Sequence, residues 1–349
     1  MLKEIIQKLV SGQSLSEAEI MEAMNCIMEG EATQAQIGSF ITALRIKGET
    51  IEEITGCAKV MRGKAEGIMP DVSYFIDTCG TGGDGAHTIN ISTAGAFVAA
   101  AGGVAVAKHG NRSVSSKCGC ADVLEALGVN IDLSPEQVKE CIENIGIGFL
   151  FAPTFHKSMK HAAGPRKELG IRTIFNILGP LTNPANAKGQ VLGVFDRKLV
   201  EPLANVLLNL NVERAMVIHG NDGLDEITIT SETFVSEVKD GEVINYTINP
   251  EAFGIKTSPA SEIKGADAQT NAEIIIDIFK GQKGAKRDIV VLNSAASLYV
   301  GKAVNSLSDG IEAARTIIDS GKALEKVSEL KNYTKKFSGQ SENMMCAVL

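Results

Sequence analysis

The stretch that decides the fold is residues 74–93, YFIDTCGTGGDGAHTINIST. It begins as a short buried strand and then places four glycines within six residues: Gly80, Gly82, Gly83 and Gly85. Glycine lets the backbone turn tightly and present N–H groups to an anion, and a helix that opens at Ser92 and Thr93 adds its positive end. We therefore predict a strand, an anion-binding loop and a helix; a tight turn without a ligand is the less favoured alternative.

Two common phosphate-binding loops do not fit this stretch. Gly80, Gly82 and Gly85 match the pattern G-x-G-x-x-G. A dinucleotide-binding fold would also place an acidic residue about twenty positions further, at the end of the second strand. Lys108 stands at the end of that strand, and the loop lacks the Lys-Ser/Thr ending of an ATP-type phosphate loop. The sequence indicates an anion-binding loop of another kind.

Beyond this stretch, brief apolar runs alternate with helical patterns. We expect strands at 74–77, 103–107, 147–152, 190–195, 214–220 and 288–295, and helices at 93–101, 121–127, 135–145 and 198–209. This alternation predicts a mostly parallel α/β sheet. Residues 225–247 alternate instead between polar and apolar, with a turn at Asp240-Gly241, which predicts an antiparallel excursion.

The N-terminal residues have the pattern of a small helical bundle. Three capping boxes open apolar runs of helical spacing: Ser14 with Glu17, Thr33 with Gln36, and Thr50 with Glu53. Four of the apolar side chains could face a subunit partner or only their own core: Met24, Ile27, Phe40 and Leu44. We predict a helical domain at 1–66, joined by about 155–185, and an α/β domain formed by 67–154 and 186–349.

Composition bounds the function. A chain of 349 residues suits two domains, and 44% hydrophobic with 22% charged residues is typical of globular proteins. The net charge of −8 disfavours nucleic acid as a partner. Seven cysteines without a secretion signal predict reduced thiols and a cytoplasmic location. Residues 85–107 carry no charged residue but begin too polar for lipid, so we expect no membrane association.

Two basic runs stand out against this acidic background. Residues 108–117, KHGNRSVSSK, follow the second strand and contain three cations and no acid. They could be a solvated loop, but ligands of open α/β sheets bind at the carboxyl ends of strands, which favours a functional loop. In the second run, 155–175, the planar fork of Arg166 suits a carboxylate. Lys157 and Lys167 are more typical of surface charges.

One acidic cluster follows the strand at 214–220. Asp222, Asp225 and Glu226 stand in the sequence NDGLDE. An adjacent pair of carboxylates at a strand end, facing phosphate-binding loops, is suited to Mg²⁺ that bridges to a polyphosphate. A pair of this kind is usually exposed to solvent when it stands alone, so its meaning depends on the neighbouring loops.

Four motifs together resemble the anthranilate phosphoribosyltransferase family, whose fold is that of the nucleoside-phosphorylase-like phosphoribosyltransferases. They are residues 80–93, 108–117, 164–185 (GPRKELGIRTIFNILGPLTNPA) and 222–226, in family order, and the resemblance covers essentially the whole chain. It implies a helical and an α/β domain with the site between them, and a homodimer formed through the helical domain. It also implies transfer of the phosphoribosyl group of 5-phosphoribosyl-1-diphosphate to the amine of anthranilate, in tryptophan biosynthesis, with two Mg²⁺ ions per subunit.

The resemblance also implies site residues. Phosphoribosyl diphosphate would be bound by Gly80, Gly83, Asp84, Thr88, Asn90, Ile91, Ser92, Thr93, Lys108, Asn111, Arg112, Ser115, Ser116 and Cys120. Anthranilate would be bound by Gly80, His109, Asn111, His156 and Arg166, and Mg²⁺ by Ser92, Asp225 and Glu226. Lys108 and Arg166 would be the catalytic residues. Cys120 stands where the family often has a small hydroxyl or alanine.

Two alternative functions stay open at this point. A pyrimidine-nucleoside phosphorylase of the same fold would use inorganic phosphate without Mg²⁺; the Asp225-Glu226 pair and Arg166 disfavour it. A non-catalytic relative that binds nucleic acid would need an extended basic surface, which the net charge of −8 disfavours.

Overall fold

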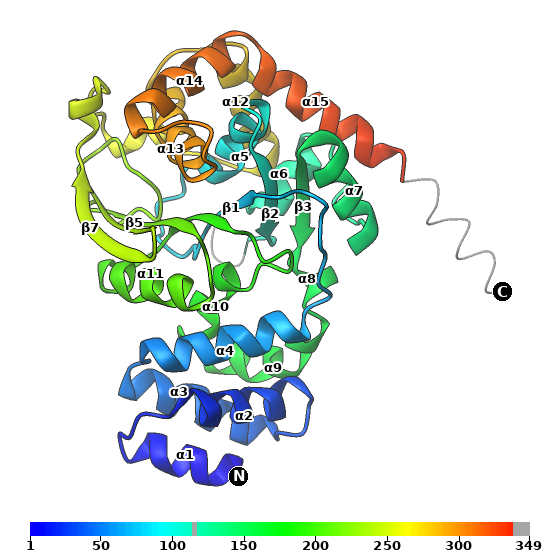
Figure 1. Cartoon of the computed structure of the whole chain (residues 1–349), viewed down its shortest axis with the longest axis vertical. Coiled ribbons are helices and arrows are strands. Elements are labelled where there is room, and N and C mark those ends of the chain that lie inside the picture. The colour runs from blue at the N-terminus through cyan, green and yellow to red at the C-terminus, as the bar shows by residue number, and fades with distance from the viewer. Residues whose placement is uncertain (114–116, 338–349) are drawn as a thin grey trace, which may run out of the picture.

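The N-terminal helices are stacked at one end of the molecule (Figure 1). A computed structural model describes residues 1–113 and 117–337 of the chain. Its first helices are α1 (Leu2–Val10), α2 (Glu17–Met28), α3 (Gln34–Lys47) and α4 (Ile51–Lys64). The four side chains that could have faced a partner, Met24, Ile27, Phe40 and Leu44, are fully buried inside this bundle. They belong to its own hydrophobic core.

Two of the three predicted capping boxes are confirmed. Thr33 with Gln36 caps α3, and Thr50 with Glu53 caps α4. The third prediction was wrong, because Ser16 with Glu19 caps α2 in place of Ser14 with Glu17. Leu15 is buried, and its backbone N–H donates to the buried carboxylate of Glu53 over 2.9 Å. This anchor holds the chain extended through Leu15, so the helix begins after it.

The α/β domain is built on a seven-stranded sheet with the order β3-β2-β1-β4-β5-β6-β7. The strands are β1 (Phe75–Gly80), β2 (Ala105–Gly110), β3 (Ile147–Phe151), β4 (Gly189–Gly193), β5 (Arg214–Gly220), β6 (Thr233–Lys239) and β7 (Glu242–Ile248). The pairs among β1 to β5 are parallel, and β5, β6 and β7 pair antiparallel. The predicted fold class, including the antiparallel excursion, is confirmed. Asp240 and Gly241 both have positive φ, 53° and 82°, as a two-residue hairpin requires.

Helices cover both faces of the sheet. The helices that follow β1 are α5 (Ile91–Ala101), α6 (Cys120–Ala126), α7 (Pro135–Ile145), α8 (Ala152–Phe155), α9 (Lys160–Leu169), α10 (Phe175–Leu181), α11 (Val200–Asn209), α12 (Ala268–Phe279), α13 (Ala285–Val300), α14 (Leu307–Asp319) and α15 (Lys322–Lys335). α5, α13, α14 and α15 pack together on one face, while α11 lies between β5, β6 and α4 (Figure 1). α9 packs against α2 and α3, and α10 against α4. These contacts join the bundle to the sheet. None of the described helices is long and apolar enough to cross a membrane.

One predicted strand was wrong. Residues 288–295, DIVVLNSA, lie within the helix α13. This helix packs against α5 on one side and α14 on another, so that Ile289, Leu292 and Ser294 are all buried. A helix buried all round shows no polar face, and its short apolar run has no periodicity that would distinguish it from a buried strand.

The strand order reverses at the glycine loop, and we use the word crevice for the region outside the carboxyl ends of the strands at this reversal. β1 lies between β2 and β4. The chain first adds β2 and β3 on one side of β1 and later adds β4 to β7 on the other side. Ligands of open α/β sheets bind outside the carboxyl ends of the strands at such a reversal. The loop after β1, the first residues of the basic run after β2 (108–113) and the acidic cluster after β5 all stand at this edge.

Candidate active site

The glycine loop is held by the strands and carboxylates around it. Gly82, Gly83 and Gly85 have φ between +64° and +80°, where residues with a side chain are strained. The Gly82 N–H donates to Oδ2 of Asp225 over 2.7 Å. A Cβ at Gly80 would lie 2.5 Å from the same oxygen. Only glycine therefore permits this approach of the loop to the acidic cluster.

The first turn of α5 binds the Glu226 carboxylate of that cluster. The Ser92 N–H donates to Oε1 of Glu226 over 3.1 Å. The Ser92 carbonyl accepts from the Thr78 hydroxyl over 3.1 Å, which ties the start of α5 to β1. A carboxylate at a helix N-terminus is stabilised by the unpaired N–H groups and the helix dipole. Residues from two separate motifs, 80–93 and 222–226, thus meet at one point.

Three carboxyl groups crowd together in the crevice. Desolvation, followed by the nearby Asp84 charge, raises the pKa of Asp225. Desolvation and the Asp225 charge raise the pKa of Glu226. Such a cluster favours either protonation or a bound cation. Among the described residues, no group of three His, Cys, Asp or Glu side chains has the arrangement of a self-sufficient metal site. A cation here would draw its remaining oxygen ligands from Ser92, water or the substrate.

Lys108 lies beneath these groups with its ammonium buried. It is only 3% exposed and donates to the Thr78 carbonyl and, over 3.4 Å, to the Ser92 hydroxyl. Its charge faces two acids, Asp77 on one side and Glu226 on the other, and lowers the pKa of both against the effect of burial. In this structure Lys108 contacts protein groups and orients Ser92. Its predicted contact with phosphoribosyl diphosphate stays a prediction.

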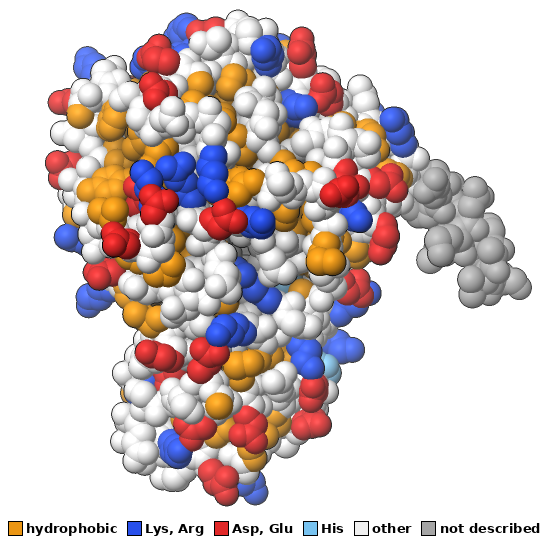
Figure 2. All heavy atoms as spheres, in the orientation of Figure 1, with side chains coloured by type: hydrophobic (Ala, Val, Ile, Leu, Met, Phe, Trp, Pro, Cys, Tyr) orange, Lys and Arg blue, Asp and Glu red, His pale blue; other side chains and the backbone are white. Residues whose placement is uncertain are grey.

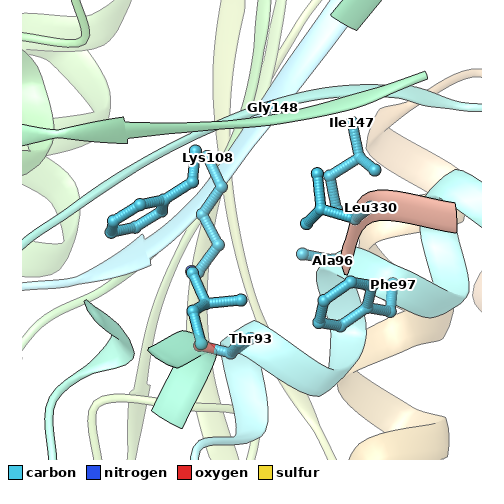
Figure 3. Close-up of a pocket in the computed structure, with 9 residues that line it drawn as sticks. Thr93, Ala96, Phe97, Lys108, Ile147, Gly148 and Leu330 are labelled. Carbon is cyan, nitrogen blue, oxygen red and sulfur yellow. The ribbon is translucent and has the colours of Figure 1, made fainter. Parts of the chain in front are cut away.

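A small apolar cavity flanks the Lys108 side chain. Its volume is about 10 Å³, and Lys108 lies across it from Ile147, Leu330 and Phe97 (Figure 3). A space of this size is at the lower limit for one water molecule and offers it almost no polar lining. The apolar wall offers the ammonium no hydrogen-bond acceptor, so its partners are the Thr78 carbonyl and the Ser92 hydroxyl.

His109 and His156 form a buried pair on the other side of the crevice. Their ring centroids lie 5.1 Å apart. The His109 ring hydrogen-bonds to the backbone of Gly179 and the His156 ring to that of Thr182, so the C-terminal part of α10 orients both. Neither Nε2 atom has a hydrogen-bond partner among the described residues. Two buried polar atoms without partners indicate a site for a polar ligand.

The same histidines predict an acid-sensitive fold. Burial lowers the pKa of His109 to about 3 and of His156 to about 4. Between these pKa values and about 6.5 only the unfolded chain binds the protons. The free energy of unfolding therefore decreases as the pH is lowered through this range, by about 2 kcal/mol per imidazole from pH 7 to pH 5. Urea unfolding at both pH values should show this difference reduced by about 2 kcal/mol in His156→Gln. The exposed-site control His87→Asn should retain it; equal pH dependence in all three proteins would contradict the assignment.

Arg166 projects from α9 and meets α10 at Phe175. Its guanidinium lies over the Phe175 ring, 5.1 Å from the centroid, and burial lowers its pKa. Residues 175–182, which are α10 and its C-cap, thus contact three of the five residues predicted for anthranilate: His109 and His156 through backbone groups and Arg166 through a ring. A desolvated guanidinium that has no acidic partner in residues 1–113 and 117–337 favours a carboxylate ligand. Lys157, by contrast, forms an exposed ion pair with Glu66.

The loop after β2 is tied to α6. The Asn111 carbonyl accepts from the Cys120 thiol over 3.2 Å, and burial raises the pKa of that thiol. Arg112 binds Asp122 and Glu125, which directs its guanidinium along α6. The predicted substrate contacts of Asn111, Arg112 and Cys120 stay predictions. Ser115 and Ser116 lie outside the described residues.

The remaining predicted residues lie along the start of α5. Asn90 accepts from the Asn271 amide over 2.9 Å, and Thr88 pairs with Lys264 in an isolated β-bridge. Ile91 is buried at the first position of α5, and the buried Thr93 hydroxyl has no partner in the described part of the chain. The segment around Lys264 therefore supports the second half of the glycine loop.

Sequence reasoning missed three residues that shape the site. Asp77 is fully buried; it accepts from the His109 backbone N–H and, over 2.8 Å, from the Asn183 amide. Asn183 also donates to the Ala107 carbonyl. At Gly193 a Cβ would lie 1.6 Å from the Asp225 carbonyl, so only glycine lets the acidic cluster rest on β4. A charged residue and a glycine inside otherwise apolar strands were the available signals.

Comparison with known proteins shows the family to which the chain belongs. Residues 3–65 match the model of the glycosyl transferase family helical bundle domain, and residues 73–324 match that of its a/b domain. The chain is 71% identical to anthranilate phosphoribosyltransferase of Acetivibrio thermocellus, over 98% of this chain and 99% of that protein. The corresponding protein of Alkaliphilus metalliredigens is 59% identical over 95% of this chain and 97% of its own length.

Solved structures give the same result. The crystal structure of anthranilate phosphoribosyltransferase from Thermus thermophilus has a TM-score of 0.90 and 42% identity, covering 95% of this chain and 99% of that one. The Saccharomyces cerevisiae enzyme in complex with PRPP and Mg has a TM-score of 0.89 and 26% identity, covering 96% and 98%. The chain belongs to the anthranilate phosphoribosyltransferases, glycosyl transferases that transfer the phosphoribosyl group of 5-phosphoribosyl-1-diphosphate (PRPP) to anthranilate in tryptophan biosynthesis.

Proposed function

We propose that the crevice at the carboxyl edge of the sheet binds the diphosphate of PRPP between the glycine loop and the carboxylates Asp225 and Glu226. The observation that carries this proposal is the pair of hydrogen bonds from Gly82 to Asp225 and from Ser92 to Glu226. They bring an anion-binding loop, a helix N-terminus and two potential metal ligands together. The complex of the yeast relative with PRPP and Mg supports it.

Ser92, Asp225 and Glu226 would hold two Mg²⁺ ions. The crowding that raises the carboxyl pKa values favours a cation at this place, because its positive charge would relieve the repulsion. Bound Mg²⁺ neutralises negative charge on the diphosphate leaving group. The N–H groups of the loop and of α5 contribute to the same stabilisation. Lys108 acts here as a positioning residue, because it fixes Ser92 and balances the charge of Glu226.

Anthranilate would lie between Arg166 and the histidine pair. Arg166 offers two parallel donors to its carboxylate, while the free Nε2 atoms of His109 and His156 and the amide of Asn111 supply further polar contacts. An aryl amine is neutral at pH 7, so the reaction needs its nitrogen to face C1 of the ribose more than it needs a general base. This arrangement works through orientation. A relative bound to 4-fluoroanthranilate supports the assignment of this ligand.

The subunit contact would use the outer face of the helical bundle. Val10 on α1 is 67% exposed and Ile46 on α3 is 82% exposed, and these two helices pack against each other. A homodimer formed through this domain would cover these two side chains. Figure 2 shows acidic and basic side chains mixed over the face that it draws, in keeping with small-molecule substrates.

Arg166→Ala should raise KM for anthranilate about a hundredfold, because it removes a charge-assisted contact worth about 2–3 kcal/mol. KM for PRPP should stay within about twofold, since Arg166 has no role at the diphosphate. Initial rates from the loss of anthranilate fluorescence provide both constants. The neighbouring exposed variant Lys167→Ala serves as the control. An unchanged anthranilate KM with a raised PRPP KM would contradict the proposal and indicate that Arg166 binds PRPP.

The overall proposal is tested by mixing the protein with Mg²⁺, anthranilate and PRPP and following the fluorescence of anthranilate. Its disappearance should require the protein, Mg²⁺ and PRPP together. The same-fold alternative is tested in parallel with thymidine and inorganic phosphate, where release of the base without Mg²⁺ would favour a phosphorylase instead.

A further inference from the structure

Arg172 connects the glycine loop to the opposite side of the crevice. It lies in the short segment between α9 and α10, 89 positions from its partner in the loop. Its guanidinium donates to the Gly83 carbonyl and stacks over the Phe195 ring, 4.1 Å from the centroid. Arg172 belongs to the second basic run, and neither the motifs nor the proposed mechanism gives it a role.

The Phe195 side of this contact is itself anchored to the loop. Phe195 follows β4, and its N–H donates to the Thr81 hydroxyl over 3.1 Å. The Thr81 N–H donates in turn to the Gly193 carbonyl over 2.9 Å. The chain of contacts from Thr81 through Phe195 and Arg172 to Gly83 therefore closes on the glycine loop. The loop is therefore held on both sides of Gly82, at Thr81 and at Gly83.

The hydrogen bond to Gly83 decides which way a peptide group points. A trans peptide places its C=O and N–H on opposite sides, so holding the Gly83 carbonyl toward Arg172 turns the Asp84 N–H away from it. Gly83 has φ of +80°, and glycine can adopt φ of either sign at little cost. Without an external contact this peptide could flip and present a carbonyl oxygen where an anion-binding loop needs an N–H.

We propose that Arg172 is a positioning residue that, with Phe195, holds the glycine loop in the orientation that binds diphosphate. The planar guanidinium suits this task because one face stacks on the ring while its edge donates to the carbonyl. The inference rests on the proposed role of the loop in binding PRPP. Arg172 lies in the segment between α9 and α10, and α9 carries Arg166. This one segment therefore contacts the proposed diphosphate position through Arg172 and adjoins the proposed anthranilate position.

The test compares Arg172→Ala, Arg172→Lys and Phe195→Leu with the wild-type enzyme. Arg172→Ala should raise KM for PRPP about tenfold, as expected for loss of one charge-assisted hydrogen bond, and should raise Ki for inorganic diphosphate in parallel. KM for anthranilate should stay within about twofold. Arg172→Lys keeps a donor without the stacked plane, and Phe195→Leu keeps the donor without the ring; both should lie between wild type and Arg172→Ala.

The matched control is Arg197→Ala. Arg197 also stacks on an aromatic ring, that of Phe234, 3.5 Å from the centroid, and among the described residues it forms no ion pair or side-chain hydrogen bond with the loop. It should leave both KM values unchanged. A PRPP KM for Arg172→Ala equal to that of Arg197→Ala would overturn the inference, as would parallel increases in both KM values. A wild-type protein without PRPP-dependent activity would instead contradict the proposed function.

Discussion

Asp225→Asn is expected to lower kcat/KM for PRPP about a thousandfold. The substitution keeps the shape of the side chain and an oxygen that can accept the Gly82 N–H, but it removes a negative charge from the proposed Mg²⁺ site. Loss of one group that stabilises developing charge typically costs a factor of about 10²–10³ in rate. The Mg²⁺ concentration at half-maximal rate should also rise, because an amide is a weaker ligand for a hard cation.

Asp222→Asn is the matched control for this experiment. Asp222 stands three positions earlier in the same acidic cluster, but its carboxylate accepts from the Thr228 and Thr230 hydroxyls and from the Leu224 N–H. Its role is to shape the turn. We expect the Mg²⁺ dependence of this variant to match that of the wild type. If Asp225→Asn also retained the wild-type Mg²⁺ dependence, Asp225 would not be a metal ligand.

Lys108→Met is expected to lower kcat about a hundredfold and the free energy of unfolding by about 3 kcal/mol. The ammonium is buried between Asp77 and Glu226, so its removal leaves buried carboxylates without a cation. It also releases the Ser92 hydroxyl from its donor. Urea unfolding and initial rates measure the two effects separately.

The double variant Lys108→Met with Asp77→Asn separates stability from catalysis. Neutralising Asp77 removes the uncompensated buried charge, so most of the lost stability should return. The rate should stay low, because the Ser92 side of the site still lacks its cation. Recovery of the rate together with stability would mean that Lys108 acts only on the fold.

The sequence predicted the elements of the fold where their patterns were local. The strand, glycine loop and helix of 74–93 are observed at β1 and α5, and the Asp240-Gly241 turn is observed between β6 and β7. Residues 288–295 were assigned to a strand because burial on all sides of α13 removes the periodicity that identifies a helix. The start of α2 was misplaced because a distant carboxylate, that of Glu53, holds Leu15 extended.

The site was predictable to the same extent. The motif residues beside the crevice could be named from glycines, cations and an acidic pair that stand close in sequence. The partners of Asp77 and Arg172 could not, because Asn183 and Gly83 lie 106 and 89 positions away; for Asp77 the one signal was a charged residue inside an apolar strand. A basic run in the sequence also does not reveal which of its members face a ligand: Arg112 binds acids of α6, whereas Arg166 stands against an aromatic ring.

The most direct test of the central claim is the loss of anthranilate fluorescence with PRPP, measured with and without Mg²⁺. If this crevice holds the diphosphate through the metal carboxylates, the fluorescence disappears with Mg²⁺ present, persists when the metal is chelated and disappears again when Mg²⁺ is restored. Persistence of anthranilate fluorescence with Mg²⁺ and both substrates present, or an equal rate of loss in the chelator, would contradict it.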